Sequence, residues 1–320
     1  MTERRVYVHA AAALGPWGDT GADERRRLDA DPPPLDLNAL TRATLGAPLR
    51  QASHFVELAA IGARLCLDAL GRRPPDAAAV YIGTGLAEVR RAAALFRQVM
   101  PPGPGLASPF DFINASNNMA AFYVAKGAGL AARNLTVKQE EFSFERALEL
   151  ADGDLRAGAV PAALVGGVDE NVQPRSDHLR RITLRDDQWM GEGSAWLYLD
   201  GDPAGARAEL VVIVEQVTAP DAPADAWAAR LAPALAALRR ASEPWQLLPG
   251  FRLRATEREA LRAALPGIGL REYLDHCGCY YSAAGFGMAT LFDAAPPPGL
   301  SLHVNRDAGG RCVAVALRAL

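Results

Sequence analysis

The chain has 320 residues, of which 50 % are hydrophobic and 22 % are charged, so it holds enough apolar material for a large buried core. Its formal net charge of −3 argues against nucleic acid or an anionic membrane surface as the main partner. No stretch approaches the roughly 20 uninterrupted apolar residues that span a bilayer. The four cysteines lack paired disulfide or zinc spacing, which favours reduced thiols in the cytoplasm.

The predicted elements alternate between strand and helix. Strands are expected over residues 6–14, 78–82, 135–138, 162–165, 195–200 and 209–217, with two closing strands around the turn at 307–310. Helices are expected over residues 51–70, 86–100, 117–127, 142–157, 222–241, 256–264 and 283–293. This alternation indicates a parallel or mixed sheet sandwiched by helices. The first residues look superficially like a signal peptide, but the apolar run is brief and contains His9, which favours a first core strand.

Three groups of motifs follow one another along the chain. In the segment Asn134–Ala151 a strand ends at Val137, and Glu141 follows four residues later at the start of a helix. A second group is Gly191-Glu-Gly-Ser-Ala195, and a third joins Tyr281-Ser-Ala-Ala-Gly285 to Asn305 and Gly309-Gly310. Each motif is weak alone, but together they resemble β-ketoacyl synthases, a thiolase-fold family of condensing enzymes.

The resemblance implies the fold and its organisation. The expected fold class is α/β, a thiolase-like αβαβα layered sandwich of two related halves, with the second half abbreviated. The halves would be residues 1–205 and 206–320, forming one integrated unit.

The catalytic groups of that family are replaced in this chain. In the family a cysteine at a helix N-terminus attacks a thioester, and two histidines assist decarboxylation of the malonyl group. Glu141 stands at the cysteine position, and Cys279 stands where one histidine would be. The stretch Glu243–Arg254, where the other histidine loop would lie, contains no histidine. A carboxylate is a poor acyl acceptor and repels a malonyl carboxylate, so no catalytic residue is expected.

Less specific interpretations of the same residues remain open. Glu141 could act as an acid or base, or could simply cap a helix, with one of the adjacent pair Glu140 and Glu141 meeting solvent or an arginine such as Arg146. Cys279 could be a nucleophile, although unpaired cysteines are usually small buried packing residues. His276 and His303 could be catalytic, although lone histidines are usually structural or exposed.

The resemblance also implies a dimer interface and an acyl tunnel. The candidates for closing the tunnel are Phe112, Met119 and Phe122, with ordinary core packing as the alternative. The expected partner-pairing strand consists of Asn134, Leu135, Thr136, Val137 and Lys138, whose free edge makes a monomer improbable. The basic residues Arg175, Arg180, Arg181 and Arg185 could contact an acidic carrier protein, although a solvated face is the favoured interpretation.

Among ketosynthase relatives, the chain looks most like a chain-length factor, in particular the short partners of aryl-polyene and type II polyketide ketosynthases. The resemblance implies a non-catalytic subunit that pairs with an active, cysteine-containing ketosynthase. No metal or nucleotide cofactor is implied, because the acyl chain would arrive at the partner on the phosphopantetheine arm of an acyl carrier protein.

Two functions from other classes remain as alternatives. The first is a malonyl-carrier-protein decarboxylase that uses Glu141, which the lack of both histidines disfavours. The second is a homodimeric acyl-binding or scaffold protein without a ketosynthase partner.

Overall fold

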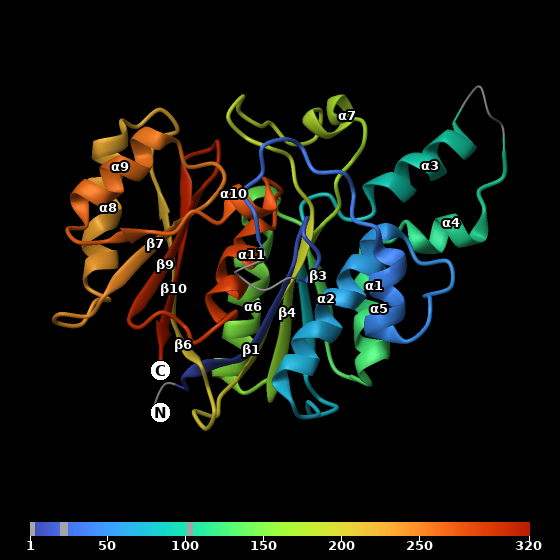
Figure 1. Cartoon of the computed structure of the whole chain (residues 1–320), viewed down its shortest axis with the longest axis horizontal. Coiled ribbons are helices and arrows are strands. Elements are labelled where there is room, and N and C mark those ends of the chain that lie inside the picture. The colour runs from blue at the N-terminus through green and yellow to red at the C-terminus, as the bar shows by residue number, and fades with distance from the viewer. Residues whose placement is uncertain (1–3, 20–24, 101–104) are drawn as a thin grey trace.

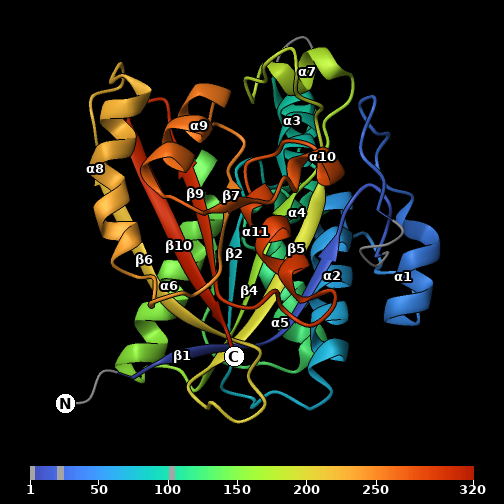
Figure 2. The ribbon, with the colours of Figure 1, turned by 60° about the vertical axis from the view of Figure 1, so that its left-hand side comes forward.

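The computed structural model describes residues 4–19, 25–100 and 105–320. The ten strands form one continuous hydrogen-bonded sheet, and we call its two five-stranded halves the first and the second sheet; these alternate with three layers of helices, as Figures 1 and 2 show from two directions. This arrangement confirms the predicted αβαβα sandwich. No helix in these ranges is both long enough and apolar enough to cross a membrane.

The first sheet consists of five strands in the order β3-β2-β4-β5-β1. The strands are β1 (Val6–Leu14), β2 (Ala79–Gly83), β3 (Asn134–Val137), β4 (Ala162–Asp169) and β5 (Gly193–Asp200). β2 is parallel to β3 and to β4, whereas β5 is antiparallel to β4 and to β1. β2, β4 and β5 are buried along their whole length, which explains their near-continuous apolar sequences.

The second sheet repeats this pattern strand for strand. Its order is β6-β10-β9-β7-β8, formed by β6 (Ala208–Val217), β7 (Trp245–Pro249), β8 (Gly269–Leu270), β9 (Leu300–Arg306) and β10 (Arg311–Ala319). The first strand again lies at one edge, antiparallel to the last, and the second strand is again parallel to the third and fourth. Only Val6–Val8 of β1 and Ala208–Leu210 of β6 join the sheets. The two halves are therefore related, and we propose residue 205 as their boundary.

The helices form one central and two outer layers. The central layer contains α6 (Ser143–Ala157) and α11 (Ala283–Ala289). The outer layer of the first half contains α2 (His54–Leu70) and α5 (Met119–Ala128), with α1 (Leu37–Leu45) packed on α2, and that of the second half contains α8 (Ala224–Ala236) and α9 (Ala255–Ala264). α11 is buried at every position, and Gly285 lies against the ring of Phe144 from α6, so small residues bring the two central helices together.

The remaining helices lie toward the ends of the strands. They are α3 (Val89–Val99), α4 (Pro109–Asn114), α7 (Arg175–Leu179) and α10 (Leu274–Cys277), with two short 3₁₀ turns, η2 (Glu140–Phe142) and η3 (Thr290–Phe292). α3 and α4 project from the body of the molecule beside α1 and α5 (Figure 1).

Every predicted strand and helix is present, with shifted ends. The strand predicted over 162–165 continues to Asp169 through Gly166 and Gly167, and the helix predicted over 222–241 ends at Ala236. β7 was not predicted, because Pro249 and Gly250 read as turn residues. α1, α4, α7, α10 and β8 were also not predicted, and they are short.

Candidate functional site

The centre of the candidate site is the turn that leads into α6. Gly83 closes β2, and a Cβ added there would lie 2.2 Å from the carbonyl oxygen of Ser143, the first residue of α6. Because this neighbour is backbone and cannot move aside, only glycine fits. The close approach places η2, which contains Glu141, against the end of the first sheet.

Glu141 is buried and forms an ion pair with Arg252. Nε and Nη2 of Arg252 lie 2.8 and 2.7 Å from Oε1 of Glu141. Nη1 of Arg252 donates to the carbonyl of Thr183 at 2.6 Å. Arg252 follows β7, in the stretch where the resemblance to ketosynthases implies a histidine loop. Glu141, the residue expected at the nucleophile position, is therefore paired with a guanidinium from the other half of the chain.

A second buried polar cluster lies behind Glu141. Nδ2 of Asn305 donates to the backbone carbonyl of Glu141 at 2.8 Å and to Oε1 of Glu145 at 3.2 Å. Nε2 of His303 lies 2.9 Å from the same Oε1, and Nδ1 of His303 lies 3.1 Å from the carbonyl of Leu248. Since a carbonyl only accepts, Nδ1 carries a proton. His303 is therefore a buried residue that links β9 to α6.

Arg146, suggested from the sequence as a partner for Glu140 or Glu141, forms ion pairs with other residues. Its guanidinium lies 2.6 Å from Glu149 and 2.7 Å from Glu215. Glu141 does meet an arginine, but it is Arg252 rather than Arg146, because Arg146 lies on a face of α6 that turns toward β6, whereas Glu141 faces the loop after β7. Glu140 is exposed, which agrees with the expectation that one of the two adjacent glutamates meets solvent.

Cys279 is buried in an apolar cluster with Leu86, Val172, Phe251 and Tyr281. Burial raises the pKa of the Cys279 thiol to about 12. The reactive form of a cysteine is the thiolate, which is scarce at neutral pH under these conditions. This environment argues against Cys279 as a nucleophile. His276 is part-exposed, and its Nδ1 lies 3.1 Å from the carbonyl of Arg26, which is a structural contact.

We expect none of the four cysteines, Cys66, Cys277, Cys279 and Cys312, to react with iodoacetamide in the folded protein. All four are buried, and burial raises the pKa of each thiol. Intact-mass measurement should find no adduct on the native chain under conditions that add four to the urea-denatured chain. Rapid modification of Cys279 in the native chain would show that this thiol is accessible.

Asp169 is a structural member of the site that the sequence did not reveal. Its Oδ1 accepts from Thr84 Oγ1 and from the amides of Gly85 and Leu86, at 2.8 to 2.9 Å. Its Oδ2 accepts from the amide and hydroxyl of Ser282 at 2.9 and 2.8 Å. Burial raises the pKa of Asp169 while these bonds oppose the rise. Asp169 thus ties the end of the first sheet to the start of α11, and only the position of the carboxyl at a strand end could have signalled it.

A polar cavity of about 300 Å³ opens beside Arg252. Arg254, Arg306, Glu257 and Asp307 also line it. Its carboxylates are committed to arginines, since Glu257 pairs with Arg254 and Arg306 and Asp307 pairs with Arg311. No group of His, Cys, Asp or Glu side chains within residues 4–19, 25–100 and 105–320 could hold a metal ion. The cavity is therefore lined by arginine side chains and by carboxylates that are already paired with arginines.

Exposed apolar side chains gather at the other side of the first half. We call this set the apolar face; its members on α3 and its C-cap, on the segment before α4, and on α4, α5 and β3 are Phe96, Val99, Met100, Leu106, Phe110, Phe112, Ile113, Phe122 and Leu135. Phe112 is 68 % exposed and Phe122 is 46 % exposed, whereas Met119 is half-buried against the core of the first half. Phe112 and Phe122 thus belong to a surface, and Met119 to the packing beneath it. Exposed apolar side chains gathered on neighbouring elements favour an interaction site.

β3, the predicted partner-pairing strand, forms one edge of the first sheet. It hydrogen-bonds to β2 on one side and to no other strand of the described chain. Asn134 and Thr136 contact Asn118 through side-chain hydrogen bonds of 2.8 and 3.0 Å, and Leu135 is 37 % exposed. The outer backbone groups of β3 lie next to the apolar face, where a second chain could pair with them.

The four arginines before the second motif have partners within the chain. Arg175 pairs with Asp31, Arg180 with Asp177 and Arg185 with Asp187. Arg181 donates to the carbonyl of Asp177 at 2.5 Å. These contacts agree with the favoured interpretation of a solvated face.

Solved structures resemble the whole chain. The ishigamide ketosynthase/chain length factor matches with a TM-score of 0.79 and 20 % identity over 99 % of each chain. A chain of AntDE:AntF, a type II PKS acyl-carrier protein in complex with its ketosynthase bound to the hexaketide, matches with a TM-score of 0.74 and 17 % identity over 100 % of each chain.

A β-ketoacyl synthase from Burkholderia phymatum STM815 matches with a TM-score of 0.72 and 15 % identity, over 99 % of this chain and 100 % of the other. No protein-family model and no curated protein matches the chain. At these identities the comparisons establish the fold, which is the thiolase-like fold of ketosynthases and chain length factors.

Proposed function

We propose that this protein is a non-catalytic subunit, similar to a chain-length factor, that pairs with an active, cysteine-containing ketosynthase. The observation that carries the proposal is the Glu141–Arg252 ion pair. The Glu141 carboxylate stands where the nucleophile of the family is expected, and it is paired with an arginine. That arginine, Arg252, belongs to the segment in which a histidine is expected. An acyl group has no acceptor there.

The apolar face and the free edge of β3 support a partner subunit. Both lie on the same side of the first half, and the partner would cover them together. In the proposed complex the acyl chain arrives on the phosphopantetheine arm of an acyl carrier protein and extends from the active site of the partner. This chain would close the far end of the tunnel and so set the length of a polyene or polyketide product. We place the complex in the cytoplasm.

A decarboxylase that uses Glu141 is less well supported. Decarboxylation of a malonyl group needs donors for the developing enolate oxygen. Arg252 is the donor at Glu141, but it is already bound to that carboxylate and to Thr183. Purified protein should therefore release no carbon dioxide from malonyl-carrier protein.

The proposal is tested by purifying the tagged chain together with a cysteine-containing ketosynthase from the same biosynthetic pathway. Mass determination of the complex should give a stable one-to-one heterodimer. A homodimer that does not bind the ketosynthase would contradict the proposal and favour the scaffold alternative.

We expect Phe122→Ala in the reconstituted complex to lengthen the product by at least one extender unit. Phe122 is half-exposed and packs edge-to-face on Tyr123, so truncation removes a ring at the covered surface with little loss of core packing. Mass spectrometry of the released products measures the change. Leu150→Ala, on the exposed side of α6, is the matched control and should leave product length unchanged. Unaltered products from Phe122→Ala would remove this residue from the tunnel.

A further inference from the structure

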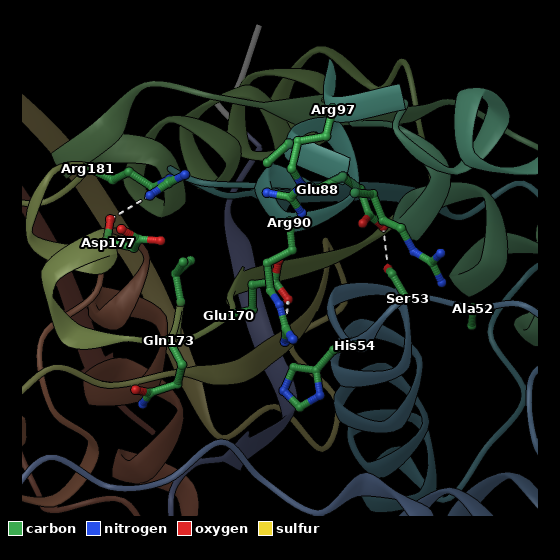
Figure 3. A pocket seen from close by; sticks show the side chains of 13 residues that line it. Ala52, Ser53, His54, Glu88, Arg90, Arg97, Glu170, Gln173, Asp177 and Arg181 are labelled. Atoms are coloured by element: carbon green, nitrogen blue, oxygen red, sulfur yellow. Dashed lines mark hydrogen bonds and ion pairs between the residues drawn. The ribbon is translucent and has the colours of Figure 1, made fainter. Parts of the chain in front are cut away.

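A separate cavity of about 460 Å³ opens at the carboxyl ends of β2 and β4 (Figure 3). It lies between the start of α2, the exposed helix α3 and the segment before α7, and it shares no lining residue with the cavity beside Arg252. Its volume is within the range of sites for small molecules. Most of its charged lining residues are arginines: Arg90, Arg91, Arg97 and Arg181.

Two buried carboxyl groups form the inner wall of this cavity. Glu88 and Glu170 are each only 1 % exposed. Oε1 of Glu88 accepts from the Ser53 hydroxyl at 2.5 Å, but its Oε2 has no hydrogen-bond partner among the described residues. Oε1 of Glu170 also has none, and its Oε2 lies 3.7 Å from Nη1 of Arg90. Buried polar atoms are normally satisfied, so two buried carboxyl oxygens without a protein partner at one cavity indicate a polar binding site.

The arginines of the cavity are only partly neutralised. Arg91 lies 3.2 Å from Asp111, and Arg181 donates to a backbone carbonyl, which carries no full charge. Arg97 forms no hydrogen bond or ion pair with the described part of the chain. In Figure 3, Arg90, Glu170 and His54 point toward one another at the floor of the cavity. The guanidinium groups thus outnumber the carboxylates bound to them.

Protonation of the two buried carboxyl groups, Glu88 and Glu170, increases this excess of positive charge. Burial raises the pKa of Glu88 to about 7 and that of Glu170 to about 8. At neutral pH Glu170 is therefore mainly uncharged and Glu88 is about half ionised. Burial opposes protonation of His54, but its hydrogen bond and attraction to Glu192 raise its pKa overall. A cation would face the guanidinium groups, whereas an anion would be attracted by them.

We propose that this cavity binds the tetrahedral oxyanion of a small phosphorylated molecule. The N–H groups of Arg90, Arg97 and Arg181 would donate to its oxygens, and the neutral carboxyl of Glu170 would donate its O–H. The volume leaves room for the organic part of the ligand beside the phosphate. The site is independent of the proposed function, because it needs no partner subunit.

Sulfate is the first probe, because its charge does not change between about pH 6.5 and about pH 9. Calorimetric titration of the purified full chain should detect binding at the lower pH. Between these pH values Glu170 and Glu88 become ionised. We expect affinity to fall about tenfold or more over this range, since each added negative charge lies within a few ångströms of the anion. Arg91, Arg97, Arg181 and Asp177 also face the cavity.

Two kinds of variant separate the roles of charge and titration. Arg90→Gln and Arg97→Gln should each weaken sulfate binding about tenfold at both pH values, by loss of a charge-assisted hydrogen bond. Arg230→Gln, an exposed arginine on α8, is the matched control and should change nothing. Glu170→Gln keeps a neutral donor at every pH, so it should bind sulfate at about pH 6.5 and lose much less affinity at about pH 9. Unchanged thermal unfolding midpoints confirm that the variants are folded.

Three results would overturn the proposal. One is the absence of sulfate and phosphate binding at millimolar concentration at the lower pH. Another is binding of ethylammonium or calcium ions in place of the anions, which would assign the two carboxyl groups to a cation site. The third is a Glu170→Gln variant with the same pH dependence as the unaltered chain. Comparison of inorganic phosphate with a sugar phosphate then tests whether the organic part adds affinity.

Discussion

Replacing Arg252 by alanine is expected to lower the free energy of unfolding by about 3 kcal/mol. The substitution removes the hydrogen bond from Nε and the ion-pair contact of Nη2 with Oε1 of Glu141, and leaves a carboxyl group buried between the two halves. Loss of one partner of a buried ion pair is strongly destabilising, because the remaining group is desolvated without compensation. We expect the lower end of the usual range, since the Arg252 side chain is 22 % exposed and water can reach it. Urea denaturation followed by circular dichroism measures the change.

Matched variants separate the ion pair from other effects at this position. Glu141→Gln keeps the shape and should cost about 1 kcal/mol. The double variant, which combines Glu141→Gln with Arg252→Ala, should be more stable than Arg252→Ala alone, because it no longer contains a buried carboxylate without a partner. Arg254→Ala, two residues away and largely exposed, should change stability by less than about 1 kcal/mol. If Arg252→Ala were no more destabilising than Arg254→Ala, the pair would not be important for stability.

Leu135→Asp is expected to weaken the proposed heterodimer at least about a hundredfold, equivalent to about 2.7 kcal/mol. Leu135 lies on the edge strand β3 beside the apolar face, where a partner would remove it from water. A carboxylate there would be buried without a counterion. The isolated chain should lose little stability, because Leu135 is already part-exposed. The variant is mixed with the ketosynthase, and size-exclusion chromatography with mass determination measures how much heterodimer forms.

Val217→Asp provides the control for this experiment. Val217 is 60 % exposed on a strand, but it lies on β6, in the second sheet. The same charge there should leave the heterodimer intact. An intact complex with Leu135→Asp, or equal weakening by both variants, would show that the partner binds elsewhere.

The sequence predicts the strands of the core because burial makes them distinctive. Ala162–Asp169 and Gly193–Asp200 are covered on both faces, so their apolar character is nearly continuous. The central helix α6 was placed within one residue, since an edge strand and a turn precede it. Trp245–Pro249 was missed because its strand is short and ends in proline and glycine, which read as a loop in isolation.

The contacts of the site are less accessible to sequence reasoning. The position of Glu141 at the start of a helix follows from the local pattern, but its partner Arg252 is 111 residues away. Arg146 is nearer in sequence and was the wrong choice, because helix geometry directs it to Glu149 and Glu215. The exposure of Phe112 depends on how α4 projects from the body of the molecule, which no periodicity in so short a helix can indicate.

The place of β1 in the sheet has a consequence for synthesis of the chain. β1 is made first, yet it pairs with β5, which ends at Asp200, and with β6, which begins at Ala208. A ribosome that adds about 5–20 residues per second needs roughly 10–40 s to reach β5. Throughout that interval the apolar segment Val6–Leu14 has neither of its partner strands available for pairing. A partner that docks at β3 would not protect it, because β1 lies at the opposite edge of the first sheet.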